Sequence, residues 1–183
     1  MNLDNRNNFA IKFLNPDKII SALDVLPGME VAHFGCGTGF FTFSAARKVG
    51  EEGSVFAIDI QSSKIEAIQS QAKILGINNI ETYRTNLEKE TKIKRGSVDW
   101  VFIINMLYQN KKKQEIIQEA ERILKIGGKI LLIDWKDKDY SLGPEMGSRV
   151  SQEELKSIIE KNGLSIYKKI DVSNFHFGWI LQK

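Results

Sequence analysis

The chain has 183 residues, of which 42% are hydrophobic and 27% charged, with a formal net charge of +3. These values are typical of one globular domain that folds without metal or disulfide staples, and so weak a basic charge does not by itself indicate nucleic-acid binding. The single cysteine, Cys36, excludes an internal disulfide and a cluster of thiolate metal ligands. No apolar run is long enough to cross a bilayer, and residues 1–8 are polar, unlike a signal peptide, so we expect a cytoplasmic protein.

Helix and strand patterns alternate in the first half of the chain. Asn15 and Pro16 are typical of a helix start, and Pro27-Gly28 of its end. Ser63 and Glu66 have the spacing of a capping box, which predicts the start of a further helix. The segments predicted after the first helix are a strand at 31–34, a helix at 40–49, a strand at 55–60, a helix from 63 to Gly76 and a strand at 80–84.

The second half continues this alternation and then changes. Val98–Ile104 is almost unbroken apolar sequence, as expected of a central parallel strand covered on both faces. Ser151 and Glu154 form another capping box. Polar and apolar residues alternate on either side of a turn at Ser173-Asn174, which predicts a hairpin. The predicted segments are a helix carrying apolar residues 116–124 and ending at Gly127-Gly128, a strand at 129–134, a helix from Ser151 to about residue 162, and two antiparallel strands at 164–172 and 175–181.

Strand–helix–strand units with short connections predict an α/β, doubly wound, Rossmann-like domain. Its sheet would have seven strands, mostly parallel, with an antiparallel hairpin at the carboxyl end and helices on both faces. We expect residues 1–26 to form an amino-terminal cap or helix and residues 27–183 to form a single domain.

A glycine-rich loop, Gly35-Cys36-Gly37-Thr38-Gly39, follows the first predicted strand. Glycine permits a positive φ and lets a ligand touch the backbone, while the start of the next helix offers free amides to an anionic group. The dinucleotide fingerprint would need glycine at position 40, which is Phe40 here, and the lysine of a phosphate-binding P-loop is missing.

Asp59 comes twenty residues after Gly39, at the end of the second predicted strand. A carboxylate at that place accepts hydrogen bonds from both hydroxyls of a ribose. Loop and acid together predict a nucleoside ligand whose other end carries a small anion. The alternative is a tight turn beside a solvated aspartate.

These segments resemble the class I S-adenosylmethionine-dependent methyltransferases, closest to the type 11 subgroup that includes quinone-biosynthesis enzymes. The resemblance runs from Pro27 to Asp134 and is carried by Gly28–Gly39, Ala57–Asp59, Val98–Phe102 and Leu124–Lys129. It implies methyl transfer from S-adenosylmethionine to a small-molecule acceptor by in-line displacement, with S-adenosylhomocysteine as product.

The resemblance also implies which residues bind the cofactor. The glycine loop would face its methionine part, Asp59 the ribose, and Ile60 the adenine. His33 stands where the family has an acidic residue, so it supplies no countercharge, and Asn86 replaces the usual aspartate near the base. The implied cofactor-binding residues are His33, Gly35, Cys36, Gly37, Thr38, Gly39, Phe40, Asp59, Ile60, Asn86, Leu87 and Asn105.

Catalysis of this kind needs alignment more than a nucleophile or a metal, and no metal-ligand motif is present. Three side chains are weak candidates for proton handling: Asp134, Tyr108 and His176, the last expected to be structural. Phe40, Tyr108 and Trp135 are plausible aromatic neighbours of the sulfonium. The segment 136–150, which includes Asp139, is long for a loop and predicts a substrate lid together with the residues around Phe9 and Phe13.

Two alternatives stay open at this point. An RNA or protein methyltransferase is favoured by the basic balance and by Lys111-Lys112-Lys113 at a predicted helix start, although a solvated helix end explains that run as well. A non-catalytic cofactor-binding or partner protein is favoured by His33 and by the absence of a clear base. The acceptor atom and the oligomeric state do not follow from the sequence.

Overall fold

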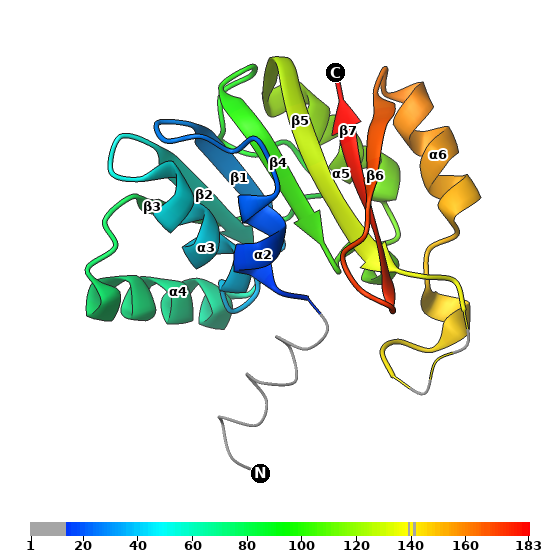
Figure 1. The fold of residues 1–183 in the computed structure, drawn as a ribbon, viewed down its shortest axis with the longest axis horizontal. Coiled ribbons are helices and arrows are strands. Elements are labelled where there is room, and N and C mark those ends of the chain that lie inside the picture. The colour runs from blue at the N-terminus through cyan, green and yellow to red at the C-terminus, as the bar shows by residue number, and fades with distance from the viewer. Residues whose placement is uncertain (1–13, 139, 141) are drawn as a thin grey trace.

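Seven strands form one sheet in the computed structural model, which describes residues 14–138, 140 and 142–183 (Figure 1). They lie in the order β3-β2-β1-β4-β5-β7-β6, and of these strands β7 alone runs antiparallel to the other six. This topology confirms the predicted doubly wound, mostly parallel sheet. The strands are β1 Glu30–Phe34, β2 Ser54–Asp59, β3 Ile80–Arg84, β4 Val98–Ile104, β5 Leu124–Trp135, β6 Ser165–Ile170 and β7 His176–Gln182.

Helices cover both faces of the sheet, as predicted (Figure 1). Side chains of β1 alternate between two cores: Val31 packs with α2 and α3, and Ala32 packs with α5 and α6. Ala57 of β2 packs with α4 on the α3 side of the sheet. The helices are α2 Pro16–Ser21, α3 Phe40–Val49, α4 Ser62–Leu75, α5 Lys113–Ile123 and α6 Gln152–Lys161, with short 3-10 turns η1 Leu107–Gln109 and η2 Met146–Ser148.

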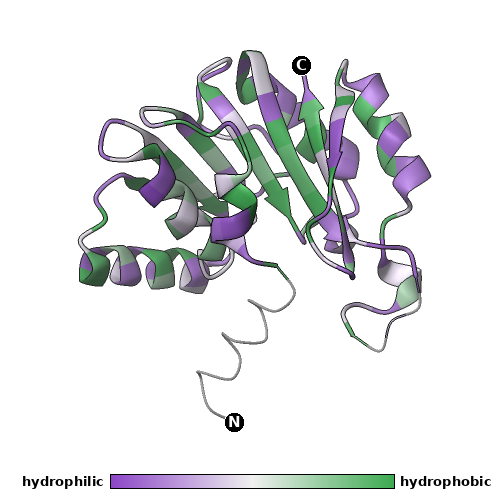
Figure 2. Cartoon of the chain, in the orientation of Figure 1, coloured by the Kyte–Doolittle hydropathy of each residue, from purple (hydrophilic) through white to green (hydrophobic). Residues whose placement is uncertain are grey.

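The central strands are mostly apolar because both of their faces are covered (Figure 2). In β4, Trp100 and Phe102 lie in one core and Val101 and Ile103 in the other, and all four are buried. Burial on both sides makes the sheet a rigid base for the loops at its carboxyl edge, where ligands bind in open α/β sheets.

Two helix boundaries in the first half differ from prediction. The first helix was expected to reach Pro27, but α2 ends at Ser21, because the amides of Ala22 and Leu23 bond to carbonyls only three residues back and so tighten the chain out of the helix. The capping box of Ser63 and Glu66 was wrong: α4 begins after Gln61, whose amide donates to a carboxylate oxygen of Asp59 at 2.9 Å.

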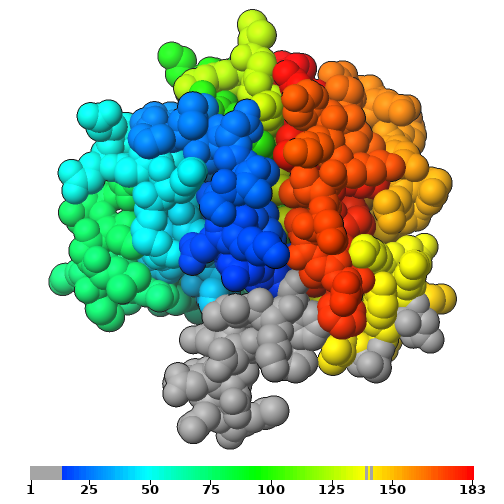
Figure 3. Space-filling view, viewed as in Figure 1, coloured from blue at the N-terminus to red at the C-terminus, as the bar shows by residue number. Residues whose placement is uncertain are grey.

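The carboxyl-terminal elements follow the predicted pattern with one addition. Ser151 caps α6 by accepting hydrogen bonds from the amides of Glu153 and Glu154. The predicted hairpin is present, but its second strand, β7, inserts between β5 and β6 and leaves β6 at the edge. Figure 3 shows the hairpin region beside the segment around α2, and Ile170, Val172 and Ile180 share a core with that segment. Within the described residues, no helix is both long and apolar enough to cross a bilayer.

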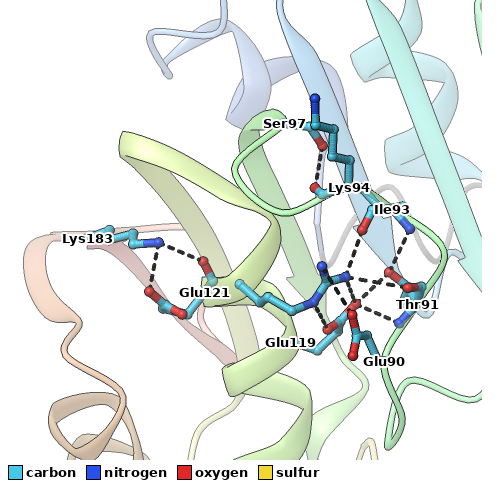
Figure 4. A network of polar contacts seen from close by, with 9 residues as sticks. Glu90, Thr91, Ile93, Lys94, Ser97, Glu119, Glu121 and Lys183 are labelled. Carbon is cyan, nitrogen blue, oxygen red and sulfur yellow. Dashed lines mark hydrogen bonds and ion pairs between the residues drawn. The ribbon is translucent and has the colours of Figure 1, made fainter.

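A buried ionic network ties the charged stretch before β4 to α5 (Figure 4). The carboxylate of Glu119 accepts hydrogen bonds from the amide and hydroxyl of Thr91 at 2.7 and 2.5 Å, and from Arg122 at 2.6 and 2.8 Å. Arg122 also donates to the carbonyl of Ile93 at 2.7 Å. This network fixes a connection that carries no regular secondary structure of its own.

Candidate functional site

A cavity of about 690 Å³ opens at the carboxyl ends of β1, β2 and β4. This volume lies within the range of pockets that hold cofactors and small organic ligands. All the residues predicted to bind the cofactor line it except Gly39. The sheet thus brings together residues that the sequence places up to 72 positions apart, from His33 to Asn105.

The glycine loop makes its turn with two residues that only glycine suits. Gly39 has φ +88°, and a Cβ there would lie 2.7 Å from Cε2 of Phe43. Gly35 has φ +66°, and its Cβ would meet the side chain of Met106 at 3.1 Å. A side chain at either position would therefore strain the backbone and displace a neighbour. Gly39 does not line the cavity, but as the N-cap residue of α3 it allows this helix to start directly beside the cavity.

Asp59 joins the end of β2 to the glycine loop. One carboxylate oxygen accepts the amide of Gly37 at 3.0 Å, and the other accepts the amide of Gln61 at 2.9 Å. The residue is 7% exposed and lines the cavity. Each oxygen has two lone pairs, so each keeps one for a ligand hydroxyl after bonding its amide. The alternative of a solvated aspartate does not fit this placement.

His33 is a buried neutral side chain at the end of β1. Its Nδ1 lies 2.8 Å from the hydroxyl of Thr42, and its ring packs edge-on against Phe41 and Phe102. Burial lowers the pKa of this imidazole to about 3, because the charged form loses its hydration. At neutral pH His33 therefore offers the cavity a polar but uncharged wall, as its residue type implied.

Asn105 has an unusual backbone and an unsatisfied side chain. Its φ is +51°, the one positive value at a non-glycine residue in the described part of the chain. Its side-chain oxygen is buried, lines the cavity region and has no hydrogen-bond partner among the described residues. A buried acceptor without a donor is rare in a folded protein, so this atom fits a ligand that supplies an N–H or O–H.

Three other predicted positions differ in what they offer a ligand. The side-chain oxygen of Asn86 accepts the amide of Glu88 at 2.9 Å, so one lone pair of this oxygen and the NH₂ group are left for a base. Ile60 is 57% exposed and presents an apolar surface. Burial raises the pKa of the Cys36 thiol to about 12, so this residue stays protonated and unreactive.

Two of the three candidates for proton handling do not line the cavity. Asp134 accepts the amides of Leu107 and Tyr108 at 3.1 and 3.3 Å with one oxygen and that of Trp135 at 2.9 Å with the other. Burial raises its pKa to about 6 against the lowering effect of these bonds. Asp134 thus holds the η1 turn in place, and burial likewise raises the pKa of the half-buried Tyr108. His176, in contrast, lines the cavity next to Trp135.

The described part of segment 136–150 forms one wall of the cavity. Arg149 holds it, donating to the carbonyls of Lys136, Leu142 and Pro144 at 3.2, 3.1 and 3.0 Å, and also to that of Lys138. Leu142 and Gly143 line the cavity. Phe9, Phe13 and Asp139, which the predicted lid includes, lie outside the described residues.

The lysine run at 111–113 lies at the start of α5, as predicted. Lys113 reaches Glu154 of α6 at 3.5 Å, and its side chain is only 16% exposed. One of the three lysines therefore has an intramolecular partner, which weakens the case for a nucleic-acid contact.

Sequence reasoning missed part of the lining. Met106 follows Asn105 directly and Gln109 comes four residues after it, so the end of β4 was the available signal for them. Leu14 and Pro16 lie at the start of the first helix. The lining residues not predicted as a site include Leu14, Pro16, Phe41, Gln61, Lys64, Thr85, Ile104, Met106, Gln109 and Asn110.

Comparison with known proteins places the chain in a family. A family model described as a methyltransferase domain matches residues 26–181. A demethylmenaquinone methyltransferase of Lactococcus lactis is 28% identical over 131 residues, covering 69% of this chain and 52% of the relative. One from Bacillus cereus (strain ATCC 10987) is 24% identical, covering 85% of this chain and 77% of that protein. The chain thus spans about half the length of the first of these relatives.

Solved structures give the same grouping. The SAM-dependent methyltransferase from Aquifex aeolicus superposes with a TM-score of 0.87 at 25% identity, covering 94% of this chain and 91% of that one. A type 11 methyltransferase from Sulfolobus solfataricus gives a TM-score of 0.71 at 22% identity, covering 84% and 82%, which is a likeness of fold.

Proposed function

The chain belongs to the methyltransferase domain family, and we propose on that basis that it transfers a methyl group from S-adenosylmethionine to a small-molecule acceptor. The observation that carries the proposal is the bond between Asp59 and the amide of Gly37, which makes the acid and the glycine loop one wall of a single cavity. The relatives named above favour a small molecule over RNA or protein, and over a protein without activity.

The residues present fit this cofactor. Asp59 keeps a free lone pair on each oxygen for the two ribose hydroxyls. The side-chain oxygen of Asn105, which has no partner among the described residues, is an acceptor for the amino group of the methionine part. His33 is neutral and so offers that amino group no countercharge. The exposed side chain of Ile60 provides an apolar surface for the adenine.

Methyl transfer mainly requires that the acceptor atom, the methyl group and the sulfur are held in line. S-adenosylmethionine supplies a methyl group on a positively charged sulfur, which is already a good leaving group. The protein residues then bind, orient and exclude water: the apolar side chains of Leu87, Ile104 and Met106 line the cavity, and Phe40 and Trp135 add aromatic faces. A base is needed only where the acceptor loses a proton, and Asp134 is committed to backbone amides instead.

Methyl transfer is tested with S-adenosylmethionine carrying a tritiated methyl group. The purified chain is incubated with reduced demethylmenaquinone, with total RNA, or with a protein extract, and label is counted in each. We expect label in the small molecule, and we expect the binding of this substrate to depend only weakly on salt concentration. Label in RNA or protein alone, or no binding of S-adenosylhomocysteine by calorimetry, would contradict the proposal.

The domain boundaries remain part of the proposal: residues 27–183 as the methyltransferase domain and residues 1–26 as a cap. Its support is that Leu14 and Pro16 line the cavity and that Ser44 of α3 donates to Asp17 of α2 at 2.5 Å. Deleting residues 1–14 is expected to raise the KM for the acceptor more than the Kd of S-adenosylhomocysteine. Unchanged cofactor binding together with unchanged turnover would show that residues 1–14 do not act as a cap.

We also propose a cytoplasmic location. Fractionation of cells that express the chain tests this proposal.

A further inference from the structure

His176 is a buried titratable side chain in the cavity wall, and the proposed function gives it no task. It begins β7 and pairs in register with Trp135 at the end of β5. The two rings lie 4.2 Å apart between centroids, and both residues line the cavity. The side chain is 1% exposed, so each of its ring nitrogens needs a partner within the protein or from a ligand.

The hydroxyl of Ser173 determines which ring nitrogen of His176 carries the proton. Its oxygen accepts the backbone amides of Phe175 at 3.2 Å and His176 at 3.1 Å, and lies 2.8 Å from Nδ1. Two accepted amides occupy both lone pairs of the hydroxyl oxygen, so its own proton is what remains for Nδ1. Ser173 therefore donates and Nδ1 accepts, which places the proton of a neutral ring on Nε2.

The ring stays neutral at physiological pH. Burial lowers the pKa of His176 to about 4, with further lowering from the nearby charges of Lys136 and Arg149. Both cations are held by their own contacts: Lys136 donates to the carbonyl of Ser173 at 3.0 Å, and Arg149 lies 5.8 Å from the ring centre of Trp135. Two fixed positive groups close to the imidazole keep it from charging and add a field that favours an anionic oxygen next to it.

Nε2 of His176 is then a buried N–H group without a hydrogen-bond acceptor in the described part of the chain. Nδ1 is on the side of Ser173, so Nε2 lies on the other side of the ring. A buried donor that the protein leaves unpaired in a cavity wall is a place where a ligand supplies the acceptor.

We propose that His176 binds an oxygen atom of the methyl acceptor, through a hydrogen bond donated by Nε2, while Trp135 supplies a flat wall for the ring that carries this oxygen. The proposal rests on the methyltransferase function and adds the residue that selects the acceptor. A carbonyl, phenol or phenolate oxygen meets the requirement, and a hydrocarbon of the same shape does not. His176 acts here as a donor, and Ser173 is the positioning residue that fixes its tautomer.

The tautomer is measured first, on the full chain. The sequence holds only two histidines, His33 and His176, so a ¹⁵N-histidine spectrum is assigned with one His33→Gln variant. We expect a protonated Nε2 and an unprotonated Nδ1 for His176 at neutral pH. In Ser173→Ala the ring is expected to lose this single tautomer. A protonated Nδ1 in the native chain would overturn the proposal.

Two substitutions then separate the donor from the ring. His176→Gln keeps an N–H near the position of Nε2 and loses the ring; His176→Phe keeps the ring against Trp135 and loses the donor. The probe is 1-naphthol, added to the complex with S-adenosylhomocysteine, and naphthalene is the matched probe without oxygen. We expect 1-naphthol to bind the native chain more tightly than naphthalene, with a shift of the Nε2 proton, and His176→Phe to weaken 1-naphthol about fivefold, the worth of one hydrogen bond. His176→Gln should retain most of the affinity.

The outcomes distinguish this inference from the function on which it rests. Failure of the native chain to bind S-adenosylhomocysteine refutes the proposed function. Normal cofactor binding with no 1-naphthol binding, with equal binding of naphthalene, or with equal losses in both variants overturns the role of His176 alone.

Discussion

Replacing Asp59 with alanine is expected to weaken the binding of S-adenosylhomocysteine by about 1–3 kcal/mol, or roughly 5- to 150-fold in Kd. The change removes the acceptor for two ribose hydroxyls. It also frees the amide of Gly37, so the glycine loop loses its tie to β2. Isothermal titration calorimetry on the native chain and the variant measures the difference directly.

The matched variant for this experiment is Asp59→Asn. Its amide oxygen still accepts one hydrogen bond and its shape is nearly the same, but the NH₂ group cannot accept the second. We expect a loss smaller than that of the alanine variant, with both variants remaining folded in a thermal melt. Equal affinities for all three chains would remove Asp59 from the binding site.

Replacing Glu119 with alanine is expected to lower the free energy of unfolding by about 3–5 kcal/mol, the cost of removing one partner from a buried ion pair. The side chain of Arg122 is only 12% exposed, and the amide of Thr91 depends on the same carboxylate. The Thr91 amide would lose its acceptor, and Arg122 would lose its buried countercharge and keep backbone carbonyls and the exposed Glu90 as partners. Urea denaturation followed by circular dichroism gives the difference.

Glu121, two residues along the same helix, provides the control. It pairs with Lys183 at 2.8 Å near the surface, where such pairs contribute about 0–1 kcal/mol (Figure 4). Glu121→Ala should therefore change stability little. A loss in Glu119→Ala no larger than that of Glu121→Ala would show that the network is not a stabilising feature.

The same network gives the protein a pH dependence with a definite sign. Burial by itself raises the pKa of Glu119, but hydrogen bonds from Arg122 and Thr91 outweigh it, so the pKa lies below the ordinary 4.5. A carboxyl whose pKa is lowered on folding stabilises the native state above its ordinary pKa, and that contribution is lost as the pH falls through the folded value. The stability advantage of the native chain over Glu119→Gln is expected to be constant near neutral pH and to shrink below about pH 4.5. An advantage that grows on acidification would contradict this.

The parts of the fold that followed from the sequence are those that depend on neighbouring residues. The glycine loop and Asp59 stand at fixed distances from the ends of two strands, so their meeting in one cavity follows from parallel pairing of β1 and β2. Val98–Ile104 was predicted as a central strand because burial on both faces leaves an unbroken apolar run.

Features that depend on contacts between residues far apart in the chain could not be predicted from the sequence. His176 was expected to be structural, and its place in the cavity wall depends on the pairing of β7 with β5, which puts it opposite Trp135. The role of Arg149 depends on carbonyls of an irregular loop, for which no sequence pattern exists. The wrong capping box at Ser63 has a similar cause: Asp59, a residue of the preceding strand, accepts the amide of Gln61, the residue directly before α4.

A crystal structure of the chain with S-adenosylhomocysteine at saturating concentration tests the location of the cofactor most directly. We predict that both ribose hydroxyls lie about 2.6–3.2 Å from the oxygens of Asp59, with the amino acid part beside Gly37 and its amino group at the side-chain oxygen of Asn105. Density for the compound at another edge of the sheet, or none in this cavity, would contradict the assignment.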